Sequence, residues 1–361
     1  MFWNDPAKAA LNQLGEVLEL NPADRAPLLP LLRGALRSGG VVGLSRAGRQ
    51  TIVSLAGVPT DGVFELASVT KPFTAALVGG LVQQGRLSWE GRLSALGGPF
   101  RGLPATFTPY SLATHTAGLP FHPARAALRQ FTQFNDPYGG LSPRQVLASA
   151  RRWAPPVGRQ PPRFAYSNLG FGVLALAAAY AAGEDLSGLG YGVGYGAALR
   201  RLVTAPLGLE SVTLVPPPAG LVTPRGVLGS SETTSFGALV GAGGLYGNAA
   251  DLLDFARSQL QGASGAFWRA AATPPGLSAP RSAVAPGWFY TPLATSKTAA
   301  GDVVWHDGVA RGTRTALGFC PATQTAVVVL ARGGLPLAGQ RALVPVLALR
   351  LLGVRFEPRS P

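Results

Sequence analysis

The sequence is poor in the residues that build disulfides and metal clusters. Its 361 residues include one cysteine, Cys320, and three histidines, His115, His122 and His306, which lie far apart along the chain. A single cysteine excludes an intrachain disulfide and a cysteine-based metal cluster, and no histidine stands in an HExxH pattern. We therefore expect no metal site built on cysteines or on an HExxH motif.

Long apolar runs are also missing. The longest, from Leu169 to Ala182, contains two glycines and is too short to span a bilayer, so it predicts a buried core helix. The start of the chain, Met1 to Asp5, lacks the basic stretch and apolar stretch of a secretory signal. These two features predict a soluble, cytoplasmic protein with no membrane span.

Acidic residues are few, 17 against 31 basic ones, and the net charge of +14 suggests nucleic-acid binding at first sight. The arginines argue against it, because they are scattered and pair only at Arg151-Arg152 and Arg200-Arg201, with no run interleaved with aromatic residues. We expect no nucleic-acid partner, and the oligomeric state stays open. Hydrophobic residues make up 47% of the chain and charged residues 13%, so a large core is expected and disorder is excluded.

Lysine is rare compared with arginine, since only Lys8, Lys71 and Lys297 occur among the 31 lysines and arginines. Lys71 stands three residues after Ser68, and residues three apart share one face of a helix. An arginine keeps its proton in proteins, whereas a partly buried lysine can lose it and accept the proton of a serine hydroxyl. The spacing therefore favours a serine nucleophile with a lysine partner.

Pro72 sharpens the expected geometry of this segment. Proline is tolerated in the first turn of a helix, so the helix should begin near Ser68 and extend to about residue 84. Unpaired N–H groups at a helix start favour developing negative charge, and one of them can form half of an oxyanion hole. The alternative is an ordinary helix start, in which Ser68 is the cap and Lys71 is solvated.

The rest of the chain predicts helices in the middle and strands towards both ends. Gly188–Gly196 is glycine-rich but lacks the G-x-G-x-x-G spacing, so we interpret it as a flexible loop. Strands at both ends indicate an α+β fold whose sheet is completed by the C-terminal part. The expected elements are a helix at 7–20, a hairpin at 41–44 and 51–55, helices within 100–210, strands at 287–290, 302–305, 313–319 and 325–330, and a helix at 335–352.

Two further motifs carry groups suited to the same chemistry. Tyr166 can transfer a proton and Asn168 offers an amide, just before the apolar helix. His306 and Gly308 end a predicted strand, where a glycine would let a ligand approach the backbone. Asn168 has an alternative role as a plain helix cap.

Two other matches to these motifs are less favoured. Tyr246 and Asn248 repeat the Tyr-x-Asn spacing, but we expect them to belong to a structural segment. Lys297 is followed by Thr298 and Ala299, which lacks a glycine and precedes the predicted strand instead of ending it.

Ser-x-x-Lys, Tyr-x-Asn and His-x-Gly in this order resemble the serine β-lactamase and penicillin-binding-protein superfamily. The resemblance is to the branch of class C β-lactamases, related esterases, D-aminopeptidases and DD-carboxypeptidases, and it extends over about residues 38–352. The stretches that carry it besides the motifs are 64–74 (FELASVTKPFT), 111–120 (SLATHTAGLP), 205–213 (APLGLESVT), 242–255 (AGGLYGNAADLLDF) and 306–330.

The resemblance implies a β-lactamase/transpeptidase-like fold, with an antiparallel sheet flanked by helices and a mainly helical region. As a single catalytic unit, the chain would form the sheet region from 1–100 and 210–361 and the helical region from 101–209. His115 and Thr116, within the matching stretch 111–120, are expected to be structural.

Roles follow from the resemblance residue by residue. Ser68 would be the acylated nucleophile, and Lys71 and Tyr166 would form the proton-transfer system, with the identity of the base left open. Asn168 would bind the substrate amide or orient Lys71. The N–H groups of Ser68 and Val309 would hold the oxyanion.

The third motif departs from the Lys-Thr-Gly of β-lactamases, because His306 replaces the lysine. A histidine there could be partly protonated around pH 7 or could act as a neutral hydrogen-bond donor. The lysine, in contrast, is a permanent cation suited to a substrate carboxylate. His-x-Gly is more typical of the esterases and aminopeptidases of the family.

The sequence as a whole predicts a serine hydrolase that forms an acyl-enzyme and acts on small esters or amides, including amides of D-amino acids. This mechanism needs neither a metal ion nor an organic cofactor, so we expect none. A β-lactamase or DD-carboxypeptidase is the alternative enzyme. The alternative of another class is a non-catalytic binding module on the same fold.

Overall fold

A computed structural model describes residues 5–132, 136–154, 163–186, 190–225, 233–262, 267–293, 302–333 and 340–355. Within these ranges, seven strands form one antiparallel sheet in the order β2-β1-β9-β8-β7-β6-β5, and a short ribbon pairs β3 with β4. The strands are β1 (Gly40–Arg46), β2 (Arg49–Leu55), β3 (Phe64–Glu65), β4 (Tyr246–Gly247), β5 (Ala283–Ala285), β6 (Trp288–Thr291), β7 (Val303–Val309), β8 (Thr313–Cys320) and β9 (Thr325–Arg332).

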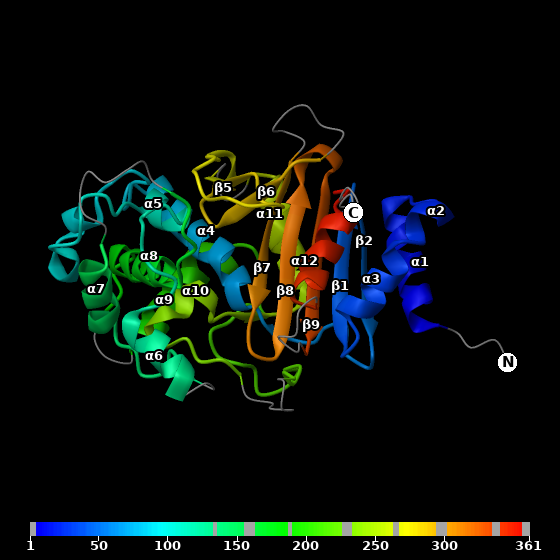
Figure 1. Cartoon of the computed structure of the whole chain (residues 1–361), viewed down its shortest axis with the longest axis horizontal. Helices are drawn as coiled ribbons and strands as arrows, with labels where there is room; N and C mark the ends of the chain where they lie inside the picture. The colour runs from blue at the N-terminus through cyan, green and yellow to red at the C-terminus, as the bar shows by residue number, and fades with distance from the viewer. Residues whose placement is uncertain are drawn as a thin grey trace.

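The hairpin of β1 and β2 comes early in the sequence, but it joins strands that come late in the sequence. β1 pairs with β9 along its whole length. β8 and most of β9 are buried on both faces, which requires helices on each side of the sheet. One face is covered by α1 (Pro6–Leu18), α3 (Leu28–Ala35) and α12 (Gln340–Leu351), and the other by α11 (Ala249–Leu260) (Figure 1). The expected α+β class and antiparallel sheet are confirmed.

Except for α2, which packs against α1 and α3 at the opposite end, the remaining helices gather at one end of the sheet around α8 (Figure 1). Asn168 and the apolar residues after it form this helix, and its residues from Asn168 to Ala179 are buried, which confirms the predicted core helix. The helices are α2 (Pro22–Arg25), α4 (Thr70–Gln83), α5 (Pro109–Ala113), α6 (Ala124–Thr132), α7 (Pro143–Arg152), α8 (Asn168–Ala181), α9 (Gly190–Leu199) and α10 (Val240–Gly243). Short 3₁₀ or π turns are η1 (Ala67–Val69), η2 (Leu93–Leu96), η3 (Gly98–Phe100), η4 (Arg200–Thr204), η5 (Gly237–Leu239), η6 (Phe267–Arg269) and η8 (Pro321–Thr323).

The loop expected at Gly188–Gly196 is wrong where the structure describes it, because residues 190–199 form α9. Tyr195 is fully buried, and its hydroxyl lies 2.6 Å from the hydroxyl of Thr74 on α4. This long-range packing overrides the low helix propensity of the glycines. None of the described helices combines the length and apolarity needed to cross a bilayer.

Candidate active site

Ser68 lies in the 3₁₀ turn η1, which leads directly into α4. The preceding Ala67 has φ 48°, a left-handed conformation that costs a non-glycine residue energy and is held by its surroundings. The Leu66 N–H donates to Leu245 O at 2.8 Å, and Leu66 O accepts the Thr315 hydroxyl at 2.8 Å. The turn is therefore fixed from both sides, and Ser68 remains partly exposed.

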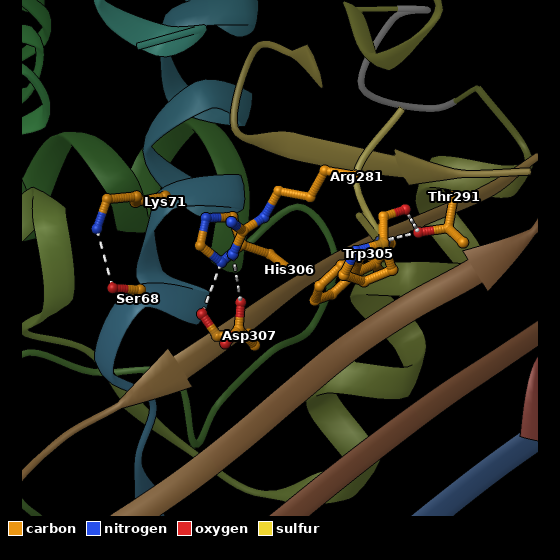
Figure 2. A network of polar contacts seen from close by, with 8 residues as sticks. Ser68, Lys71, Arg281, Thr291, Trp305, His306 and Asp307 are labelled. Atoms are coloured by element: carbon orange, nitrogen blue, oxygen red, sulfur yellow. Dashed lines mark hydrogen bonds and ion pairs between the residues drawn. The ribbon is translucent and has the colours of Figure 1, made fainter. Parts of the chain in front are cut away.

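Lys71 is completely buried, so the alternative of a solvated lysine is wrong. Its Nζ lies 3.0 Å from Ser68 Oγ, 2.8 Å from Asn168 Oδ1 and 2.7 Å from Ala242 O (Figure 2 shows the contact with Ser68). Burial lowers the pKa of Lys71 well below its ordinary value, and the Asp307 carboxylate opposes this only in part. Burial therefore favours the neutral amine form of Lys71, next to a serine hydroxyl.

Asn168 is not the cap of its helix. Ser167 takes that position: its hydroxyl accepts the Gly170 N–H at 2.8 Å and donates to Pro120 O at 2.6 Å. The Asn168 side chain is therefore free to bind Lys71 through Oδ1 and, through Nδ2, the hydroxyl of Tyr138 at 3.2 Å.

Tyr166 lies beside the lysine, with Lys71 Nζ 4.8 Å from the centre of its ring. Burial raises the pKa of the Tyr166 phenol, and a hydrogen bond with Ser68 offsets this in part. The phenol therefore keeps its proton near neutral pH.

His115 positions Tyr166, a contact that the sequence analysis did not assign to the site. Its ring stacks on Tyr166 with centroids 4.3 Å apart, and its Nδ1 accepts the Ser167 N–H at 3.0 Å. The backbone oxygen of His115 also accepts the Ala165 N–H at 2.8 Å. Burial lowers the pKa of His115 well below its usual value, so the ring is the neutral acceptor that this contact requires. In the sequence, only the family resemblance of stretch 111–120 pointed to His115 as part of the site.

His306 lies on β7 and is buried, and its Nδ1 donates to the Asp307 backbone oxygen at 2.7 Å. Burial is the main cause that lowers its pKa well below the usual value, so the ring is neutral and a histidine that is partly protonated near pH 7 is not supported. Its Nε2 is buried and has no hydrogen-bond partner within the described residues. The ring thus has an unused acceptor, and its centre lies 6.2 Å from the centre of the Tyr166 ring.

Gly308 has a packing reason to lack a side chain, and the expected approach of a ligand to its backbone stays a prediction. A Cβ atom there would lie 2.1 Å from Thr315 Oγ1 and 2.4 Å from Leu66 O. The glycine lets β7 pack against the turn that carries Ser68. Val309, the next residue, is 43% exposed at the end of β7, beyond the segment of the strand that pairs with β6.

A second group that the sequence analysis did not assign is Arg281, from the segment before β5. Its Nη2 lies 3.8 Å from Asp307 Oδ1, and its guanidinium covers the Phe289 ring at 4.3 Å. Figure 2 shows His306 and Arg281 both directed at Asp307. Burial raises the pKa of Asp307, and the Arg281 cation opposes this. No motif surrounds Arg281, because only the fold brings it to β7.

The less favoured motif matches lie elsewhere. Tyr246 belongs to β4, and Asn248 caps α11 through a 3.0 Å bond from the Asp251 N–H to Oδ1. Residues 297–299 lie outside the described residues. Among the side chains that the structure describes, no group of three or more His, Cys, Asp or Glu residues is placed to hold a metal ion.

Comparison with known proteins agrees with this geometry. The sequence model of the β-lactamase family matches residues 31–350. The chain is also 31% identical over 211 residues to the D-alanyl-D-alanine-carboxypeptidase/endopeptidase AmpH of Escherichia coli (strain K12). That match covers 55% of this chain and 49% of AmpH, so the chain spans about half the length of this relative.

Solved structures share the fold at low sequence identity. A β-lactamase/D-alanine carboxypeptidase from Pseudomonas syringae has a TM-score of 0.73 at 19% identity, with 95% of this chain and 98% of that one covered. The D-amino acid amidase of Ochrobactrum anthropi SV3 has a TM-score of 0.71 at 17% identity, covering 91% and 98%. Because the family model covers most of the chain and the fold agrees, the protein belongs to the β-lactamase family, whose members are serine hydrolases.

Proposed function

We propose that this protein hydrolyses small esters or amides through an acyl-enzyme formed on Ser68. The observation that carries the proposal is the buried Lys71 amine, 3.0 Å from the Ser68 hydroxyl. A fully desolvated lysine without a carboxylate bonded to it destabilises a protein. Its presence therefore argues against the non-catalytic binding module.

The partners of Lys71 support its role as the base. A neutral amine has two N–H donors and one lone pair. Ala242 O can only accept, and Asn168 presents its Oδ1 acceptor, so these two atoms use both donors. The lone pair is then directed at the third neighbour, Ser68, where it can take the hydroxyl proton.

The reaction would proceed in two halves. Ser68 Oγ bonds to the substrate carbonyl carbon, its proton passes to Lys71, and the carbonyl electron pair moves onto oxygen. The tetrahedral species then collapses: the bond to the leaving oxygen or nitrogen breaks, and the leaving group takes the proton from Lys71 by way of the Tyr166 hydroxyl. Water repeats these steps on the acyl-enzyme and frees Ser68.

The N–H groups of Ser68 and Val309 are the proposed oxyanion donors. Ser68 stands in the turn before α4, where backbone N–H groups are not used by the helix. The packing of Gly308 against Leu66 supports this assignment, because it joins the end of β7 to the nucleophile turn.

The substrate class follows from what faces the site. His306 is neutral, which favours an uncharged ester or amide over a carboxylate at that position. D-Amino acid amides are included because AmpH and the Ochrobactrum amidase are named for D-amino acid substrates. Arg281, a permanent cation beside Asp307, favours the second candidate, a DD-carboxypeptidase or β-lactamase whose substrates carry a carboxylate.

One set of assays separates these functions. The protein is treated with a fluorophosphonate probe and assayed with p-nitrophenyl acyl esters, D-amino acid p-nitroanilides and a chromogenic cephalosporin. Ser68→Ala should lose labelling and turnover, whereas Ser88→Ala, at an exposed turn, should keep both. Undiminished labelling of Ser68→Ala contradicts the assignment, and faster turnover of the cephalosporin than of every ester favours the β-lactamase.

A further inference from the structure

A buried polar chain continues from the active lysine past Asn168. Asn168 Nδ2 donates to the Tyr138 hydroxyl at 3.2 Å, and that hydroxyl lies 2.7 Å from His122 Nδ1. Tyr138 is 5% exposed and stacks on Phe236 with ring centroids 5.3 Å apart. Two of these contacts are hydrogen bonds, and they connect Tyr138 to Lys71 through Asn168.

Near neutral pH, the protons of this chain can be arranged so that each donor faces an acceptor. Burial raises the pKa of Tyr138 to about 12 and is the main cause that lowers the pKa of His122 to about 4, so both side chains are neutral. Tyr138 therefore has one proton to donate, and His122 Nδ1 accepts it in the tautomer that is protonated at Nε2. Its oxygen is then left to accept from Asn168.

We infer that Tyr138, held by His122, is a positioning residue that keeps the Asn168 oxygen, and not its nitrogen, facing Lys71. This rests on the proposed role of Lys71 as the base. If the Asn168 amide were flipped by 180°, its Nδ2 would face Lys71. The Nδ2–H would then donate to the lone pair that must accept the Ser68 proton. Tyr138 thus acts through Asn168 to direct the lone pair of Lys71 towards Ser68.

The first test is a double-mutant cycle on turnover of a p-nitrophenyl ester. Tyr138→Phe leaves a buried amide N–H without an acceptor, and kcat should fall about tenfold while KM changes less than about threefold. In an Asn168→Ala background, the same change should alter kcat by less than about twofold, because the amide it acts through is gone. Tyr110→Phe, which removes a hydroxyl bonded to Ala270 O at 3.2 Å, is the control and should leave kcat unchanged.

A tenfold loss in both backgrounds would mean that Tyr138 acts independently of Asn168, and would overturn the inference. An unchanged kcat in Tyr138→Phe alone would overturn it as well. If the parent protein shows no turnover that depends on Ser68, the proposed function fails, and the inference is then decided by a second measurement.

That measurement follows Lys71 directly. With Lys8 and Lys297 replaced by arginine, Lys71 is the only lysine, and its ¹⁵Nζ signal can be titrated by NMR. Tyr138→Phe should move the midpoint to lower pH, because the amide oxygen no longer stabilises the ammonium form. Tyr110→Phe should leave it in place. A Lys71 signal and midpoint that are the same in all three proteins would refute the inference without reference to catalysis.

Discussion

The buried Lys71 should give the protein a pH-dependent stability that a single substitution removes. Its pKa is lowered in the folded protein, whereas in the unfolded chain it titrates near its ordinary value of 10.5. Between these two values the unfolded chain carries one more proton than the folded protein. Stability therefore rises with pH across this window and is lost as the pH falls.

The magnitude follows from proton linkage. One proton of difference changes the free energy of unfolding by about 1.4 kcal/mol per pH unit, so an interval from pH 8 to pH 9.5 corresponds to about 2 kcal/mol. Lys71→Met keeps an unbranched side chain of similar length but has no proton to exchange. The difference in unfolding free energy between the parent and Lys71→Met should thus change by about 2 kcal/mol over this interval, in favour of the parent at the higher pH.

Urea denaturation followed by tryptophan fluorescence at both pH values measures this difference, with the slope m compared to verify that the same unfolding is observed. Other groups that titrate in this range cancel, because both proteins contain them. Lys8→Met, at an exposed lysine on α1, is the matched control and should show no such change. If the parent and Lys71→Met show the same pH dependence, Lys71 is not a desolvated amine and the argument for it as the base fails.

Three further changes test separate parts of the site. Lys71→Arg should reduce fluorophosphonate labelling of Ser68 by about 10²- to 10⁴-fold, since a guanidinium cannot act as a base; labelling at the parent rate would contradict this. Gly308→Ala should lower the free energy of unfolding by about 1–3 kcal/mol in urea denaturation, because the new Cβ meets Leu66 O. Gly192→Ala is the control and should not lower it, because a Cβ there has nothing within 4 Å. Equal effects of the two changes would contradict the packing argument. His115→Ala should lower kcat about tenfold through a misplaced Tyr166, with stability measured in parallel, and an unchanged kcat would show that the stacking does not position the phenol.

Local patterns were sufficient for the parts of the fold in which one segment determines its own structure. The apolar stretch from Leu169 predicted α8, and the hairpin signal at 41–55 predicted β1 and β2. The pattern failed at α9, because a distant residue, Thr74, binds Tyr195 and fixes a glycine-rich segment as a helix. It also left Asn168 ambiguous, since two adjacent residues can each cap a helix and only Pro120 O, from another segment, favours Ser167.

The site residues that the sequence did not assign share one property: each acts through a long-range contact. Arg281 has no motif around it, and Tyr138 is connected to Lys71 only through Asn168. His115 lies in a stretch with a family resemblance, but its contact with Tyr166 depends on how that stretch crosses the start of α8. The motifs predict the reacting groups, whereas the groups that orient them depend on the fold.

Burial acts on the two proton-transfer groups in opposite directions, and this bears on which of them is the base. Desolvation disfavours a charged form, so it lowers the pKa of the Lys71 ammonium and raises the pKa of the Tyr166 phenol. The same environment thus favours a free amine beside a protonated phenol, both in contact with Ser68. When two titratable groups are pushed apart in this way, the one that loses its proton accepts and the one that keeps it donates. We therefore infer that Lys71 starts the reaction as the base, and that Tyr166 carries the proton onward to the leaving group.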